Sequence, residues 1–438
     1  MTGFERKRTN ALLAAGVLSV AVLLSFVACN GGSGGGGAGI GGSGYKASGT
    51  ITEFGSIFVN GVEFDTATAA FEIEDGSGSQ ADLSRGMRVV VEGSLDPSGT
   101  TGTAVRVHFE DELEGPIPAG STITEDADQE NKRFAILGVP VTANFADTIY
   151  VGSDYGTLSP GNNLQISGFY DSAGLLHATA VVKKSAFTPN ATIVEAKGTV
   201  TSLSGNSLTL RVGATSLTVD VAAADLSGVP GGLAVGQRVE AKGTIAADTA
   251  TALAGTAVKL EEGFSDGLKV ELEGIVTRFS STSSFDVDGN LVNASAAALT
   301  PSSLTLKVGL RIEVEGTVSN GTLEATAVKV REGDVRVRAT ASNVNTTANT
   351  FDVTLAGQTV SVTATATTQM RDKTSSAVLS LATLALVDGR FLRVRGYDDG
   401  TGRGIVATRI EIDTLDKSEI QAVLSSQVIG VSVTLLGV

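Results

Sequence analysis

One eleven-residue stretch recurs along the chain and limits what the chain can fold into. Its first copy is Leu83-Ser-Arg-Gly86-Met-Arg-Val89-Val-Val91-Glu-Gly93. The stretch, called the cassette below, combines a turn containing glycine, a run alternating between apolar and polar residues, and a closing glycine. Alternation with a period of two is typical of a β-strand with one buried face. The cassette therefore predicts a turn followed by a strand.

The cassette occurs five times at regular intervals. Its turn glycines are Gly86, Gly161, Gly236, Gly309 and Gly389, and its closing glycines are Gly93, Gly168, Gly243, Gly316 and Gly396. The turn glycines are 75, 75, 73 and 80 residues apart (86 to 161 to 236 to 309 to 389). Such spacing indicates tandem repeats, each large enough for a small core of its own. We expect these glycines to be structural and the leucine that opens each cassette to close one end of a barrel.

Other short strands surround the cassette. In the first repeat, Asn60-Gly61 separates the apolar runs 57–59 and 62–64, which predicts a hairpin with a type I′ turn. Strands are also expected at 49–54, 70–73 and 104–109. Five short strands with one apolar face each must curl to bury it, and closure hides their edges. The sequence predicts an all-β chain of small five-stranded antiparallel barrels, OB-like, arranged as beads on a chain; a two-sheet sandwich is the alternative.

The repeats divide the chain into consecutive segments. We expect a signal peptide at 1–28, a lipidated cysteine and glycine-rich tether at 29–44, unit one at 45–112, unit two at 113–195, unit three at 196–270, unit four at 271–334, unit five at 335–415 and a partial sixth repeat at 416–438. The last segment has apolar runs but no cassette. Its strands should add to an edge of unit five or of another chain, unless the sequence is truncated there.

The first residues of the chain have the pattern of an export signal. Arg6-Lys-Arg8 precede an apolar run from Ala11 to Val27, and Ala28 and Cys29 follow. This order resembles the bacterial lipoprotein signal, although Phe26 stands where that family prefers leucine. The resemblance implies cleavage between Ala28 and Cys29, and acyl chains on Cys29 that anchor the protein in a lipid bilayer. The alternative is an uncleaved signal anchor. By the same resemblance, Asn30 favours the outer membrane, facing the periplasm or the cell surface.

Charge and composition restrict the partners. The formal net charge is −15 and aromatic residues make up 5% of the chain. Nucleic-acid binding requires a basic surface that neutralises phosphates, so we expect no nucleic-acid partner. Arg390, Arg393 and Arg395 in unit five are the exception, and we interpret them mainly as a solvated face. The single cysteine excludes an intrachain disulfide.

Few residues could build a catalytic or metal site. His108 and His177 occupy non-equivalent places in two repeats, and we interpret them as unrelated surface histidines. The acidic runs 110–114 and 286–290 lack the ligand spacing of a calcium loop, so we interpret them as a solvated linker and a hairpin turn. We expect no catalytic residues, no metal and no cofactor.

The repeats resemble a bacterial family. The run Gly49-Thr-Ile51, Phe54-Gly-Ser-Ile57-Phe-Val59-Asn-Gly61-Val62 and the first cassette are similar to domain of unknown function 5666. Units three and four match fairly well, and units two and five match mainly through the cassette. The resemblance implies exported proteins, often lipoproteins, and supplies no activity or catalytic residue.

Two functions remain open from the sequence. The leading hypothesis is a membrane-anchored protein of the cell envelope, without catalytic activity, whose repeats act as a spacer or a protein-interaction array. The alternative is an envelope protein that binds a glycan or a divalent cation or, less favoured, a hydrolase. Beyond the lipid bilayer, the expected partner is an envelope protein or a glycan.

Overall fold

A computed structural model describes residues 44–97, 99–126, 130–145, 147–302, 304–331, 335–372, 374–375, 379–399, 401–413, 418–422, 424–428, 432–436 and 438. Ala28, Cys29 and the tether before Gly44 lie outside this described part. Among the described helices, none has both the length and the apolar character needed to cross a membrane.

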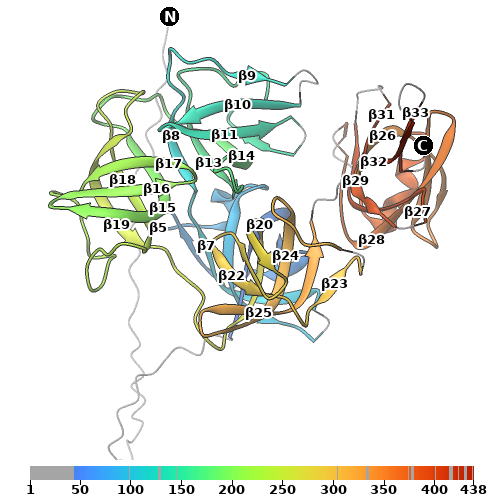
Figure 1. Cartoon of the computed structure of the whole chain (residues 1–438), viewed down its shortest axis with the longest axis horizontal. Helices are drawn as coiled ribbons and strands as arrows, with labels where there is room; N and C mark the ends of the chain where they lie inside the picture. The colour runs from blue at the N-terminus through green and yellow to red at the C-terminus, as the bar shows by residue number, and fades with distance from the viewer. Residues whose placement is uncertain are drawn as a thin grey trace, which may run out of the picture. The chain divides into compact units, whose positions relative to one another are not determined.

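Unit one, blue in Figure 1, is a closed barrel by its strand pairing. It contains β1 (Tyr45–Phe54), β2 (Ile57–Val59), β3 (Val62–Asp65), β4 (Ala70–Ile73), β5 (Gly76–Ser77), the 3-10 helix η1 (Gln80–Asp82), β6 (Arg88–Leu95) and β7 (Thr101–Phe109). The pairing runs β1-β2-β3-β7-β6 and returns to β1. All these neighbours are antiparallel except β3 and β7. The predicted hairpin turn is present, because Asn60 and Gly61 have φ of 56° and 85°.

Units two and three have a similar order of strands along the chain. Unit two contains β8 (Leu113–Pro116), β9 (Thr124–Glu125), β10 (Asn131–Ile136), β11 (Val139–Asn144), β12 (Ile149–Val151), β13 (Asn163–Tyr170) and β14 (Leu176–Lys183). Unit three contains β15 (Ile193–Ser204), β16 (Ser207–Val212), β17 (Thr215–Asp220), β18 (Arg238–Thr244) and β19 (Ala252–Leu260). The two units share one hydrophobic core, to which β13 contributes Ile166 and β18 contributes Val239.

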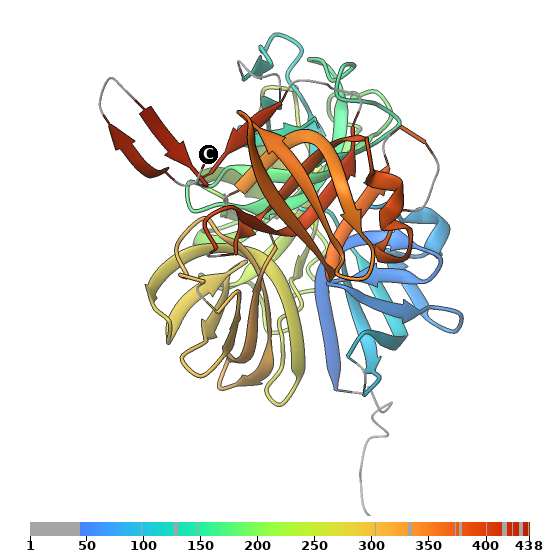
Figure 2. The same cartoon turned by 90° about the vertical axis from the view of Figure 1, so that its right-hand side faces the viewer.

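Units four and five follow the same plan. Unit four contains β20 (Lys269–Ser281), β21 (Ser284–Val287), β22 (Asn290–Asn293), β23 (Ala298–Thr300), β24 (Arg311–Ser319) and β25 (Thr322–Val330). Unit five, orange and red in Figure 2, contains β26 (Val335–Asn345), β27 (Thr350–Leu355), β28 (Gln358–Asp372), the 3-10 helix η2 (Leu381–Val387), β29 (Phe391–Asp398) and β30 (Gly404–Ile412). The predicted all-β chain of small OB-like barrels in tandem is confirmed.

Strand pairing also joins the barrels to one another, which differs from the predicted arrangement as beads on a chain. Units one and four form a 13-stranded sheet, because β1 pairs in parallel with β20 over Tyr45–Ser48 and Lys269–Leu272. Units two and three form a 12-stranded sheet, because β8 pairs with both β13 and β15. In each case the first strand of a unit offers an edge to another unit.

The cassette forms the turn and fourth strand of every barrel. Its five turn glycines have φ between +69° and +94°, a region that glycine adopts without strain. At each closing glycine the register with the fifth strand shifts by a bulge. A Cβ atom there would lie 2.1–2.5 Å from a backbone oxygen of the fifth strand. Close backbone approach therefore accounts for the closing glycines.

The first residue of the cassette behaves as expected in four units. Leu83, Leu158 and Leu306 are buried, and Leu233 is partly buried against the core. For unit five the expectation is wrong, because Leu386 is 47% exposed. There η2 replaces the simple turn and buries Leu384 and Val387 instead.

The final segment extends unit five. Its strand β31 (Glu419–Gln421) pairs antiparallel with β26, with Ile420 opposite Val337. The strands β32 (Leu424–Val428) and β33 (Ser432–Leu435) form a separate two-stranded sheet. Leu436 is buried in the core of unit five. Of the two placements expected for this segment, the structure contains the edge of unit five.

Candidate functional site

The polar residues that the fold brings together lie where units one to four meet. The segment between β7 and β8 carries Glu110, Asp111 and Glu112 through this junction. The acidic run was interpreted as a solvated linker, and that interpretation is wrong. Asp111 is 0% exposed and Glu112 is 7% exposed. The segment is short, so the barrels it connects pack around its side chains.

Arg88 at the start of β6 links three parts of the junction. Its Nη1 lies 2.5 Å from Glu112 Oε1, and its Nη2 lies 2.5 Å from Asp288 Oδ2 of unit four. Nη1 also donates to the carbonyl oxygen of Gly168, and the guanidinium lies 4.3 Å from the ring centroid of Phe169 in unit two. Burial would lower the pKa of Arg88, but the two carboxylates outweigh it and raise this pKa.

Asp288 is more buried than its place in the predicted hairpin turn suggested. The run 286–290 is a hairpin turn, as predicted, but the Asp288 side chain is only 15% exposed and is held by Arg88. Asp286, by contrast, pairs with Arg278 on the exposed side of the hairpin. The turn therefore connects units one and four instead of lying in solvent.

Lysines neutralise the carboxylates on the side of unit three. Lys242 Nζ lies 2.6 Å from Asp75, 2.9 Å from Glu195, 3.2 Å from Glu240 and 3.6 Å from Glu74. Lys259 contacts Asp75 and Glu240, each at 2.7 Å, and also Glu110. Lys197 lies 3.3 Å from Glu110 and 3.7 Å from Glu261. These pairs join unit three to unit one and to the linker.

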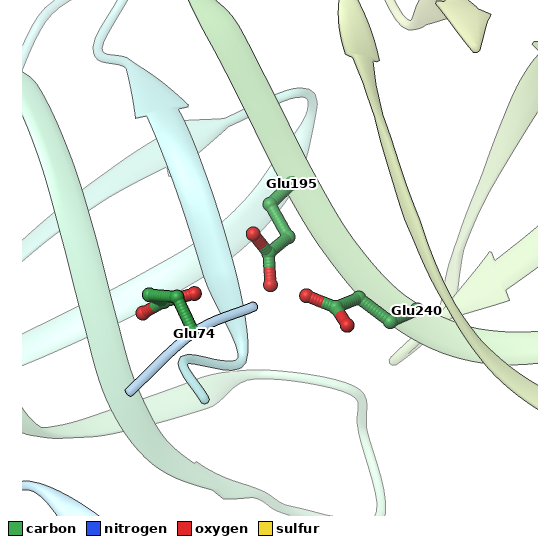
Figure 3. A group of neighbouring side chains, drawn as sticks. All are labelled: Glu74, Glu195 and Glu240. Atoms are coloured by element: carbon green, nitrogen blue, oxygen red, sulfur yellow. The ribbon is translucent and has the colours of Figure 1, made fainter. Parts of the chain in front are cut away.

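Two groups of three carboxylates have the spacing that could hold a cation. One is Glu74, Glu195 and Glu240, which point toward one another in Figure 3. The other is Asp75, Glu110 and Glu240. Lys242 contacts every member of the first group and Lys259 every member of the second. Each group therefore already contains an ammonium ion that supplies the balancing charge.

Asp111 differs from its neighbours. Among the described residues neither of its carboxylate oxygens has a hydrogen-bond partner. Burial raises its pKa well above the usual range, and the nearby Glu74 and Glu114 add to this, while Lys197 and Lys184 oppose it. A buried carboxyl in this setting favours the neutral acid.

A cavity of about 440 Å³ opens beside these pairs, between units one, three and four. Its lining includes Arg88, His108, Lys197, Arg238, Glu261 and Asn290. The interpretation of His108 as a surface histidine is wrong, because its side chain is 13% exposed. It lies 3.2 Å from Glu110 and 3.5 Å from Glu72. His177 is exposed beside Asp171, as expected of a surface histidine. Both signs of charge line this cavity, which we call the junction cavity.

The interpretation of the unit-five arginines as a solvated face is wrong for two of the three. Arg393 and Arg395 are each 3% exposed, whereas Arg390 is exposed as predicted. Arg395 contacts Asp147 of unit two, and Arg393 lies 3.6 Å from Glu130 of the same unit. The face interpreted as solvated therefore lies against unit two.

Sequence reasoning missed Arg88, Lys242 and Glu240, and it interpreted Glu112 as part of a solvated linker. Arg88 and Asp288 are 200 positions apart, and local patterns carry no information on such a pair. One signal was present: Glu240 and Lys242 are the outward positions of a cassette strand. Alternation identifies the outward face of a barrel strand, but it does not show whether another barrel covers that face.

Comparisons with known proteins address the fold and the family. Similarity was found to the solved structure "drosophila Unr CSD456", at 15% identity and a TM-score of 0.14, covering 50% of this chain and 97% of that chain. A multidomain protein with nucleic acid binding domains from Streptococcus pneumoniae tigr4 is similar at 10% identity and a TM-score of 0.14, covering 50% and 73%. Scores this low say nothing about function. No curated protein matches the chain.

The repeats themselves match a family model. The matches cover residues 48–108, 121–182, 197–254, 273–329 and 340–411. Each match lies within one of the five units and contains the whole of its cassette strand. The chain therefore belongs to the family described as Domain of unknown function (DUF5666).

Proposed function

We propose that this protein is a lipid-anchored component of the bacterial cell envelope whose interlocked repeats form a non-catalytic spacer or interaction body. The anchor is Cys29, carried by the export signal, and the tether 30–44 links it to unit one. A chain of about 15 glycine-rich residues has a mean span on the order of 20 Å, so the repeats stay near the bilayer.

The observation that carries the proposal is how the buried charges are used. Arg88, Lys197, Lys242 and Lys259 each contact two or more carboxylates, and most of those partners belong to another unit or to the linker. Acid–base catalysis requires a group that can reach a substrate proton. Carboxylates held by lysines from neighbouring barrels serve to join the barrels, which suits a structural body better than an active site.

Replacing Cys29 with serine tests the anchor. Serine cannot accept the thioether-linked lipid, so the Cys29→Ser protein should leave the membrane fraction and appear in the soluble envelope fraction. Wild-type protein and a Ser33→Ala variant in the tether serve as controls and should stay with the membrane. A Cys29→Ser protein that still sediments with membranes would contradict the anchor.

The carboxylate triads favour a second candidate, a site for a divalent cation. Calcium prefers six to eight oxygen ligands. The three carboxylates in Figure 3, those of Glu74, Glu195 and Glu240, converge. Because Lys242 contacts all three, we expect no heat when millimolar calcium is titrated into the wild-type protein. A Lys242→Gln variant removes the competing charge and should gain calcium binding. Saturable calcium binding by the wild type would favour the cation-binding function.

A further inference from the structure

A second cavity, distinct from the junction cavity, is unusually rich in arginine for an acidic chain. Its volume is about 270 Å³ and its lining comes from units one, two, four and five. Five half-buried arginines line it: Arg85, Arg311, Arg331, Arg371 and Arg409. The formal net charge of the chain is −15, so this concentration of cations departs from its average composition. We call this space the arginine cavity.

Three of these arginines are neutralised by carboxylates. Arg311 Nη2 lies 2.8 Å from Glu273, Arg409 Nη1 lies 3.0 Å from Asp147, and Arg331 contacts Glu313. Their guanidinium groups are fixed by these contacts, and they form a positively charged wall that is already balanced. They explain the position of the cavity but do not by themselves require a ligand.

Arg85 and Arg371 are different. For neither of them does the described part of the chain contain an ion pair. Burial lowers the pKa of Arg371, and the like charges of Arg85 and Arg409 lower it further, while Glu411 opposes them. The positive charge of Arg85 acts to lower the pKa of Glu53, but burial outweighs it and raises this pKa. Arg85 and Arg371 thus line the same cavity and repel each other. Glu53 also lines the cavity and Glu411 is the cross-strand partner of Arg371, but the described part of the chain contains no ion pair of either carboxylate with these two arginines.

We propose that the arginine cavity binds a small oxyanion, a phosphate or a carboxylate carried by a small molecule. A guanidinium presents parallel N–H donors that match two oxygens of either group. Apolar side chains of Ile51, Phe58 and Met370 form part of the wall and lower the local dielectric, which strengthens the attraction. The bound anion would relieve the repulsion between Arg85 and Arg371.

The size of the cavity limits the ligand. A volume of about 270 Å³ lies near the lower end of the range of small-molecule pockets, which is about 300–1,000 Å³. One phosphate or a small organic acid fits within this space, whereas a folded polymer does not. The site therefore selects a small metabolite or a single head group instead of a nucleic-acid strand.

Titration of the full chain in detergent tests the proposal. Inorganic phosphate and sodium acetate are titrated separately at constant ionic strength, with sodium chloride as the comparison for nonspecific screening. We expect saturable binding of at least one oxyanion and none of chloride. The phosphate and acetate titrations then distinguish the two sources of the shared chemistry. Absence of saturable binding for both would overturn the proposal.

Matched variants place the binding in this cavity. Arg371→Gln and Arg85→Gln should each weaken oxyanion binding at least tenfold. Arg278→Gln removes an exposed arginine that pairs with Asp286 outside the cavity, so it should bind as the wild type does. Equal affinity of all three variants would overturn the assignment.

The stability of the variants guards against misfolding as an explanation. Because burial and the like charges of Arg85 and Arg409 disfavour the Arg371 cation more than Glu411 favours it, Arg371→Gln should unfold at the same temperature as the wild type or higher without ligand. The oxyanion that binds should raise the unfolding temperature of the wild type and of Arg278→Gln, and should raise that of Arg371→Gln less. A fall in the melting temperature of Arg371→Gln would show that Arg371 is needed for the fold and would contradict the proposed role. None of these results depends on whether Cys29 anchors the protein.

Discussion

At the scale of single residues, the closing glycine of the cassette is the position most tightly constrained by its surroundings. In unit one a Cβ on Gly93 would lie 2.1 Å from the carbonyl oxygen of Thr103 on the neighbouring strand. The register shifts between Glu92 and Gly93, so the bulge brings this oxygen over the glycine. Backbone cannot move aside as a flexible side chain can. The other four closing glycines meet the same contact.

A Gly93→Ala substitution should destabilise unit one by about 1–3 kcal/mol, the usual cost of overpacking a close contact. Equilibrium denaturation followed by circular dichroism measures this. Gly120→Ala is the matched control, because no atom lies within 4 Å of its added Cβ, and its stability should be unchanged or slightly higher. Equal stability of both variants would contradict the bulge.

At Asp111 the constraint is burial of an ionisable group, whereas at Gly93 it is a close steric contact. Its pKa is raised in the folded state, so the neutral acid is the form that the fold prefers. The stability linked to this group is fully present below the pKa of the unfolded chain, about 3.9, and is lost as pH rises through the raised folded pKa. Ionisation at high pH therefore opposes folding.

The Asp111→Asn variant should remove this dependence on pH. Asparagine keeps the shape of the side chain and cannot ionise. The free energy of unfolding of the variant should therefore increase relative to that of the wild type as pH rises from 4 to 8. Denaturant titrations at several pH values measure the difference. A difference that stays constant with pH would show that Asp111 has an ordinary pKa in the fold.

At the scale of elements, alternation within the cassette strand correctly predicted which residues face the barrel interior. Val239 and Ala241 lie in the core, and Glu240 and Lys242 point outward. An outward position nonetheless differs from an exposed one, since Glu240 is 0% exposed. Strand periodicity reports the side of a sheet, and the neighbouring barrel that covers that side is set by distant parts of the chain.

The first strand of each barrel shows the same dependence on distant partners. Its N-terminal half pairs with the fourth strand on one edge, while its other edge would be free after the second strand diverges. That edge is covered in unit one by β20, in unit two by β15, and in unit five by β31. Covering an edge prevents pairing with another chain.

Proline at position 420 should uncover the edge of unit five. Ile420 lies opposite Val337 and packs against the core, and proline cannot donate a ladder hydrogen bond. We expect faster amide hydrogen exchange at residues 336–338 and concentration-dependent association by light scattering. Ile420→Val, which keeps the strand, should behave as the wild type does. Unchanged exchange in Ile420→Pro would contradict the pairing.

At the scale of the whole molecule, the charges on outward strand faces differ between units. The cross-strand neighbours are Glu240 with Lys259 in unit three and Glu313 with Lys329 in unit four. In unit five the signs are reversed, with Arg393 beside Glu411 on the fourth and fifth strands. Unit five accordingly meets the carboxylates Glu130 and Asp147 of unit two.

The sequence predicted the number, order and internal plan of the barrels because these follow from local turns and alternation. It did not predict that unit one pairs with unit four and unit two with unit three. The residues that make these contacts lie in different repeats, as Arg88 and Asp288 do, and resemble ordinary surface charges in the sequence. For the same reason the sequence did not indicate that the residues at each cavity come together.

The most direct test of the account is to cut the chain between units three and four. A protease site inserted after Ser265, in the exposed segment before β20, would divide the chain into residues 1–265 and 266–438. Because β1 pairs with β20 and Arg88 holds Asp288, the two fragments should co-elute in gel filtration under native conditions and separate only in denaturant. Fragments that separate at once in native buffer would show that the repeats are independent beads and would contradict the interlocked body.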